Sequence, residues 1–174
     1  AGFPGLVLKI IRSDIHVHLL ESSKKKCSFL ERIISILNLD KAGILNGRAE
    51  FFGHDGDYRQ TCDVVTCRAV SHLSVISEYS FPFLKEGGLF IAQKGPAGIS
   101  ELEEAEYAIR TLGGEISAVK KLFLPCKGEK RVILVFKKKG ETPRDYPRRN
   151  GVPVRKPLHL MLKRRFRKGN ERIR

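Results

Sequence analysis

The sequence has few cysteines, and their spacing is not that of a metal or disulfide site. The four cysteines are Cys27, Cys62, Cys67 and Cys126. They form no Cys-x-x-Cys pair and have no histidine at a matching distance, which argues against a zinc site and against a disulfide framework. His16 and His18 lie within one predicted strand without a third ligand at suitable spacing. We therefore expect reduced thiols and no bound metal.

Long apolar runs are also absent. No segment approaches the ~20 apolar residues that a membrane-spanning helix needs. No charged segment followed by an apolar one opens the chain, as it would in a secretory leader. These absences favour a cytoplasmic protein that does not act at a membrane.

The charge of the chain is strongly positive and unevenly distributed. The 174 residues are 41% hydrophobic and 30% charged, which predicts a single globular domain with tails. Of the net charge of +14, the segment 147–174 contributes +10, from eleven Lys or Arg residues and one acid. A polycationic end gains affinity for a polyanion by releasing counterions, so nucleic acid is the first partner to consider. A solvated, disordered tail is an equal alternative on charge alone.

Apolar runs and helical periodicities alternate along the chain. The expected strands cover residues 15–20, 42–45, 63–67, 89–92, 116–124 and 131–136. The expected helices cover residues 4–11, 23–38, 73–84 and 100–112, the third of them in spite of Pro82 and closed by the glycines at 87–88. This order predicts a parallel sheet wrapped by helices, with ligands at the carboxyl ends of the strands. The last two strands have the spacing of an antiparallel hairpin.

The start of the chain carries a weak signal for a ligand loop. Gly2 and Gly5 precede a predicted helix, as glycines do in many ordinary turns. Glu21 ends the following strand, nineteen residues after Gly2. This is close to the ~20-residue offset at which an acid accepts hydrogen bonds from a ribose diol. The two signals agree in geometry.

Five short motifs occur in order and together resemble one family. They are Ala1-Gly2-Phe3-Pro4-Gly5, Gly47-Arg48-Ala49-Glu50, Arg68-Ala69-Val70, Lys94-Gly95 and the segment from Tyr146 to Pro153. Over about residues 1–158 the chain resembles the RsmG or GidB family, bacterial methyltransferases that act on guanine N7 of 16S rRNA. The resemblance implies a class I S-adenosylmethionine-dependent methyltransferase, an α/β Rossmann-like sheet with a terminal antiparallel hairpin.

The chain departs from the family pattern at both ends. The glycine-rich segment and central first strand that precede this point in the family are not in the sequence, so we expect an N-terminally truncated methyltransferase domain over residues 1–140. Residues 141–174 form a basic C-terminal tail in this interpretation, and 159–174 extend past the usual family ending.

The resemblance also implies site residues. Cofactor contacts fall on Gly2, Phe3, Glu21, Ser22, Ser23, Ala49, Glu50 and Arg68. Given this resemblance, we expect RNA contacts, in preference to a merely solvated basic run, at Lys94, Arg148, Arg149, Arg155 and Lys156. Gly2 allows close backbone approach, Glu21 accepts from the ribose, and Arg68 pairs with a carboxylate or phosphate. Three of the cofactor residues also have a purely structural alternative: for Glu21 a helix-dipole charge, for Phe3 an ordinary core position, and for Arg68 a surface ion pair.

The implied reaction needs no catalytic acid or base. Guanine N7 has a free lone pair and carries no proton, so positioning of the methyl group dominates. The implied partner is 16S ribosomal RNA or the small ribosomal subunit. Two alternatives are a non-catalytic RNA-binding remnant of the fold and a small-molecule methyltransferase.

Overall fold

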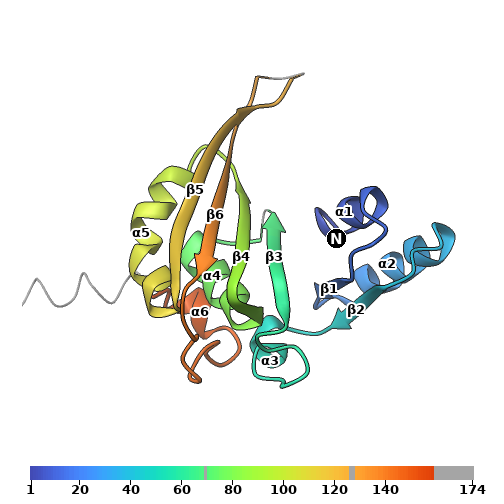
Figure 1. Ribbon diagram of the computed structural model, residues 1–174, viewed down its shortest axis with the longest axis horizontal. Helices are drawn as coiled ribbons and strands as arrows, with labels where there is room; N and C mark the ends of the chain where they lie inside the picture. Colours follow the sequence, from blue (N-terminus) through green and yellow to red (C-terminus); the bar gives the residue numbers. More distant parts are fainter. Residues whose placement is uncertain (69, 126–127, 159–174) are drawn as a thin grey trace, which may run out of the picture.

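Strands and helices follow the alternating order that the sequence predicts. A computed structural model describes residues 1–68, 70–125 and 128–158 (Figure 1). The strands are β1 (Val17–Glu21), β2 (Ala42–Asn46), β3 (Cys62–Arg68), β4 (Leu84–Lys94), β5 (Gly114–Phe123) and β6 (Lys130–Lys138). The helices are α1 (Gly5–Ile11), α2 (Lys24–Ile36), α3 (Ala49–Phe52), α4 (Leu73–Ser80), α5 (Gly98–Thr111) and α6 (Val152–Arg155), with a 3-10 turn η1 (Phe81–Phe83).

The strands form two sheets. β1 and β2 pair in parallel, from Val17 opposite Ala42 to Glu21 opposite Asn46. The second sheet has the order β3-β4-β6-β5, in which β3 and β4 are parallel and the other pairs are antiparallel. The predicted terminal hairpin is therefore confirmed, with β5 at the edge of the sheet.

The break between the sheets lies between β1 and β3. Among the described residues, each of these strands pairs with a neighbour along one edge only. In Figure 1, β3 forms one border of the larger sheet, and β1 with β2 lies to its right. Unpaired strand edges leave backbone N–H and C=O groups without ladder partners. β1 and β3 therefore each have one edge without a strand partner among the described residues.

The main core lies between the larger sheet and the helices α4 and α5. Among the described residues it contains fourteen buried apolar side chains, including Phe90, Leu134 and Phe136. The rings of Phe90 and Phe136 stack with their centroids 5.5 Å apart. The two-stranded sheet has a much smaller core, of Leu6, Leu19 and Leu30, from α1, β1 and α2.

The prediction of one helix over residues 73–84 is wrong at its C-terminal end. α4 ends at Ser80, η1 follows, and β4 begins at Leu84. Pro82 explains the change, because it has no N–H to donate and its ring clashes with the carbonyl four residues earlier. Residues 85–88, expected to lie in a closing turn, therefore belong to a strand. The short helices α3 and α6 were not predicted.

In the part of the chain that the structure describes, no helix is both long enough and apolar enough to span a membrane.

Candidate functional site

The N-terminal loop places Gly2 and Phe3 beside the end of β3. Gly2 has a φ of 77°, and a β-carbon there would lie 2.6 Å from Leu6 Cδ1, so only glycine fits. The Phe3 side chain is 64% exposed, which excludes the alternative that it belongs to the core. The Arg68 guanidinium carbon lies 5.8 Å from the centroid of the Phe3 ring, within cation-π range. Two predicted cofactor residues from distant parts of the sequence thus meet at the open edge of β3.

Glu21 lies at the carboxyl end of β1, as predicted. Its carboxylate Oε1 accepts a hydrogen bond from the backbone N–H of Ser23 at 3.0 Å, and Lys26 Nζ lies 3.9 Å from Oε2. The side chain remains 18% exposed. Ser23 occupies the N-cap of α2 without a side-chain capping bond, and Ser22 is exposed. Glu21 is therefore oriented by the following turn while part of its carboxylate stays accessible.

Glu50 is buried under the C-terminal loop. Its Oε1 accepts a hydrogen bond from the backbone N–H of Gly151 at 3.2 Å, and only 8% of the residue is exposed. Burial, and next the neighbouring Glu50 carboxylate, raise the pKa of Tyr79 to about 12. The Glu50 side chain thus faces the protein. At this turn, the backbone of Ala49 and Glu50 is the remaining candidate for a contact with the cofactor's base.

A cavity of about 500 Å³ opens at the same turn. Its lining residues are Asn46, Gly47, Arg48, Glu50, Phe51, Arg149 and Asn150. The cavity therefore joins one predicted cofactor residue, Glu50, to one predicted RNA residue, Arg149, although they are far apart in the sequence. Arg48 and Arg149 are both exposed and give its mouth a positive charge.

Lys94, at the end of β4, is engaged inside the protein. Its Nζ lies 2.6 Å from Glu101 Oε2 and donates to the Ser71 carbonyl at 2.8 Å. The side chain is 10% exposed. Contact with an RNA phosphate would require this ion pair to open, because the side chain is largely buried and its ammonium group already faces the Glu101 carboxylate.

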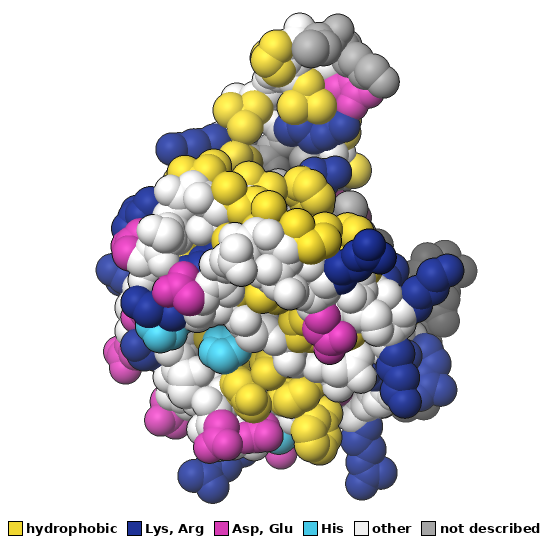
Figure 2. Space-filling view, turned by 90° about the vertical axis from the view of Figure 1, so that its right-hand side faces the viewer, with side chains coloured by type: hydrophobic (Ala, Val, Ile, Leu, Met, Phe, Trp, Pro, Cys, Tyr) yellow, Lys and Arg dark blue, Asp and Glu magenta, His cyan; other side chains and the backbone are white. Residues whose placement is uncertain are grey.

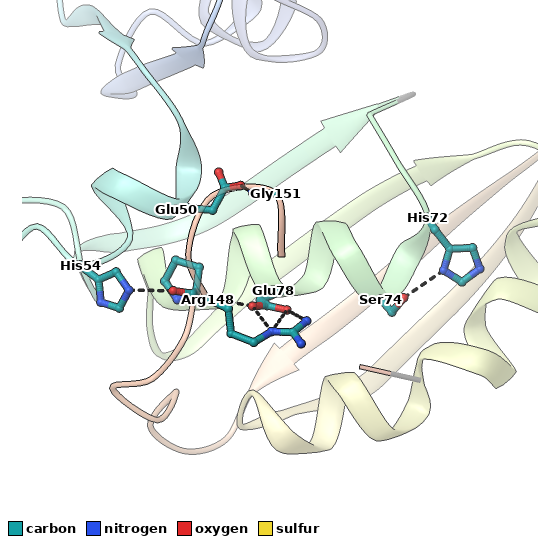
Figure 3. A network of polar contacts seen from close by, with 8 residues as sticks. Glu50, His54, His72, Ser74, Glu78, Arg148 and Gly151 are labelled. Carbon is teal, nitrogen blue, oxygen red and sulfur yellow. Dashed lines mark hydrogen bonds and ion pairs between the residues drawn. The ribbon is translucent and has the colours of Figure 1, made fainter. Parts of the chain in front are cut away.

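Arg148 forms a buried ion pair with Glu78. The guanidinium Nη2 donates to Glu78 Oε2 at 2.7 Å and Nε donates to Oε1 at 2.9 Å, while the backbone N–H of Arg148 also donates to Oε1 at 2.8 Å (Figure 3). The side chains of Glu78 and Arg148 are 1% and 17% exposed. The arginine therefore fixes the loop on α4 and has little surface left for RNA.

Two further side chains hold the same loop. Arg59 donates to the carbonyls of Gly53, Thr142 and Tyr146 at 2.7–2.9 Å. Burial lowers the pKa of its guanidinium. His54 Nε2 lies 2.7 Å from the Pro147 carbonyl.

Sequence reasoning did not identify Glu78, Arg59 or His54. Glu78 carried a usable signal, since it is the single charged residue within the segment Leu73–Ser80. Arg59 and His54 lie between the predicted elements, where no periodicity marks them.

The remaining predicted RNA residues are on the surface. Arg149, Arg155 and Lys156 are exposed, and Arg155 also donates to the Gly151 carbonyl at 3.2 Å. The predicted extension 159–174 lies outside the described residues.

The structure offers no metal site among the residues it describes, since no group of three His, Cys, Asp or Glu side chains is suitably placed. Cys27, Cys62 and Cys67 are free thiols. Burial raises the pKa of Cys67 to about 12, so that thiol is a poor nucleophile at neutral pH. Cys126 is outside the described part of the chain.

Comparison with known proteins identifies the relatives of this chain. Residues 1–133 match the family model GidB, described as rRNA small subunit methyltransferase G. The chain is 42% identical over 159 residues to the ribosomal RNA small subunit methyltransferase G of Lactobacillus acidophilus. The alignment covers 91% of this chain and 66% of the relative, so the chain spans slightly less than two thirds of that protein.

Solved structures show the fold. A predicted O-methyltransferase from Agrobacterium tumefaciens superposes with a TM-score of 0.62 at 16% identity, covering 80% of this chain and 70% of that one. TYW2 of M. jannaschii, solved in complex with AdoMet, superposes with a TM-score of 0.50 at 18% identity, covering 71% of this chain and 58% of that one. The α/β arrangement described above is thus the Rossmann-like fold of class I methyltransferases.

Proposed function

Because the chain belongs to the GidB family of rRNA small subunit methyltransferases, we propose that its parent protein transfers a methyl group from S-adenosylmethionine to guanine N7 of 16S rRNA. The observation that carries the proposal is the contact between Phe3 of the N-terminal loop and Arg68 at the carboxyl end of β3, with Glu21 at the carboxyl end of β1. This is the end of an α/β sheet at which ligands bind. An rRNA substrate, free or within the small subunit, would place the activity in the cytoplasm.

The residues present fit a cofactor of this kind. Gly2 allows close backbone approach, and the exposed Phe3 ring offers an apolar wall. Glu21 offers an oriented and partly exposed carboxylate for ribose hydroxyls. Ser22 and Ser23 extend that turn, and the backbone of Ala49 and Glu50 lies after β2. Arg68 can pair with the cofactor's carboxylate, because its guanidinium forms no ion pair with any described acid.

In this proposal the protein accelerates the reaction by positioning the cofactor's methyl group against guanine N7. The bound cofactor supplies an electrophilic methyl group, and guanine N7 supplies a lone pair without loss of a proton. Ordering two reactants in this way is worth about 7 kcal/mol or more of the barrier. The protein's residues therefore have to bind, orient and exclude water, which is consistent with the lack of an acid–base pair in the predicted site.

The RNA contacts divide into two roles. Arg149, Arg155 and Lys156 are exposed and suited to phosphates. Arg148 acts as a positioning residue, because its ion pair with Glu78 fixes the loop that presents Arg149 at the cavity. Lys94 would reach RNA only if its bond to Glu101 opened.

The experiment is a titration followed by an assay. Isothermal titration measures S-adenosylmethionine binding to the 174-residue chain and to a chimera that adds the unmatched part of the L. acidophilus relative. Methyl transfer from labelled cofactor to 16S rRNA, with mapping of the modified base, is then measured on the chimera. We expect binding by the chimera and label at guanine N7. Absence of a heat signal from both proteins would refute the methyltransferase assignment. Cofactor binding by the chimera without methylation of 16S rRNA and without salt-sensitive RNA affinity would point to a small-molecule substrate.

A further inference from the structure

The β5–β6 hairpin runs beyond the end of its neighbour β4. β4 pairs with β6 up to Val132, whereas β5 stays paired with β6 for two further positions, to Phe123 opposite Lys130. The end of the hairpin is thus a two-stranded ribbon without a third strand, and it projects from the body at the top of Figure 1. It points past the carboxyl ends of β3 and β4, the end of the sheet that also carries Arg68.

Three side chains share one face of this ribbon. Lys121 and Phe123 are two residues apart on β5, so they point to the same side, and Lys130 lies directly opposite Phe123. We refer to Lys121, Phe123 and Lys130 as the tip triad. Phe123 is 67% exposed and both lysines are exposed. Figure 2 shows apolar and basic side chains gathered on the projecting end.

The charge of the tip triad is not neutralised within the described part of the protein. Neither Lys121 nor Lys130 forms an ion pair there. The neighbouring acid, Glu129, pairs with Arg131, which points to the opposite face. An exposed aromatic ring is therefore flanked by a cation along its own strand and another across the hairpin.

This arrangement matches the chemistry of an unpaired nucleotide segment. A base stacks on an aromatic ring whatever its identity, and the phosphates on either side of it attract ammonium groups. We propose that the tip triad binds single-stranded RNA, with one base on Phe123 and the adjacent phosphates on Lys121 and Lys130. The inference rests on the proposed function, since it extends the contact with an RNA substrate from the site to an arm that overhangs it.

The test compares RNA affinity among variants of the full chain. Fluorescence anisotropy with a labelled, unstructured oligoribonucleotide gives the dissociation constant at several salt concentrations. Phe123→Ala is expected to weaken binding about tenfold, because base–aromatic stacking is lost. The matched control is Phe29→Ala on α2, an aromatic residue that is 54% exposed and distant in the fold, and it should bind as the unsubstituted chain does.

The lysines are tested through the salt dependence. The double variant Lys121→Gln/Lys130→Gln should reduce the slope of log affinity against log salt by about 1.4, the value for two phosphate contacts on a single strand. Lys137→Gln/Lys139→Gln, at the other end of the same hairpin, removes the same charge and should leave the slope unchanged. A fully paired RNA should be much less sensitive to Phe123→Ala, since its bases are not free to stack.

Three results would overturn the inference. Unchanged RNA affinity in Phe123→Ala would remove the stacking contact, and an unchanged salt slope in the lysine variant would remove the phosphate contacts. Phe123-dependent binding to anionic phosphatidylserine vesicles, with RNA binding unaffected, would assign the tip to a membrane surface. Cofactor titration of the 174-residue chain and of the chimera separates this inference from the proposed function. Absence of cofactor binding by both proteins, with RNA binding that still depends on Phe123, would refute only the proposed function.

Discussion

The two sheets of this protein differ sharply in how well they are packed. Among the described residues, the four-stranded sheet shares a core cluster of fourteen buried side chains, whereas the two-stranded sheet shares one of three. The helices beside the smaller sheet keep large apolar side chains exposed, among them Ile11 at 72% and Ile36 at 60%. Since burial of apolar surface is the main stabilising term, the smaller unit should open more readily.

The predicted site takes its residues from both sheets. Gly2, Phe3 and Glu21 belong to the thinly packed unit, whereas Arg68 ends a strand of the larger sheet. The C-terminal loop is bound to the well-packed unit through Glu78, Arg59 and Thr142. Most of the predicted cofactor residues therefore lie on the half with the smaller core, and the predicted RNA residues lie on the half with the larger core.

The largest change in stability is expected for a substitution in the half that contains the four-stranded sheet. Glu78→Ala should lower the free energy of unfolding by about 3–5 kcal/mol, because it leaves the Arg148 guanidinium largely buried without a partner. Urea denaturation measures the change. Glu103→Ala, at an exposed position of α5, is the control and should change stability by less than about 0.5 kcal/mol. A loss below about 1 kcal/mol for Glu78→Ala would mean that the loop is not anchored by this pair.

A pair of core truncations contrasts the two sheets directly. Leu134→Ala should lower global stability by about 2–5 kcal/mol, because the side chain is fully buried in the large cluster. Leu30→Ala should instead act locally, raising hydrogen exchange in 17–21 and 42–46 while leaving 132–136 protected. Native-state hydrogen exchange distinguishes the two patterns. Equal loss of protection across both sheets in Leu30→Ala would show that they unfold as one unit.

Replacement of Arg68 tests the place where the larger sheet meets Phe3 of the N-terminal loop. In the chimera used for the cofactor titration, Arg68→Ala should weaken cofactor binding about tenfold to a hundredfold, the worth of one hydrogen bond to a charged group. Arg110→Ala is a matched control, because Arg110 is 77% exposed on α5. Cofactor affinity and turnover that both stay unchanged would remove Arg68 from the site.

The smallest expected effect is a dependence of stability on pH that arises from Lys138. Its Nζ is buried and donates to the carbonyls of Phe81 and Leu84 at 3.0 and 2.7 Å. Burial, followed by the charge of Arg59, lowers the pKa of Lys138 to about 8 from the ordinary value of 10.5. Between these values the unfolded chain binds more protons than the folded one, so stability should rise with pH.

The comparison with Lys138→Met isolates this contribution. The slope of unfolding free energy against pH, between about 8 and 10.5, should be smaller in Lys138→Met than in the unsubstituted chain. Equal slopes would show that Lys138 titrates as an exposed lysine does.

The sequence by itself determined the order of strands and helices, the terminal hairpin and the family. These depend on local signals: apolar periodicity, turn residues and short motifs such as Gly47-Arg48-Ala49-Glu50. The helix predicted over 73–84 was too long, because the apolar pattern continues past Pro82. The structure ends the helix at Ser80, since Pro82 has no N–H to donate.

Only the tertiary structure decided what several predicted site residues contact. Arg148 was predicted to contact RNA as one of a basic run, but Glu78, seventy positions away in the sequence, occupies its guanidinium. Glu50 similarly meets Gly151 across 101 positions. Local patterns carry no information about such pairings, because a buried charge is partnered by whatever the fold brings within hydrogen-bond distance. The same reason explains why Phe3, a core candidate by composition, lies exposed against Arg68.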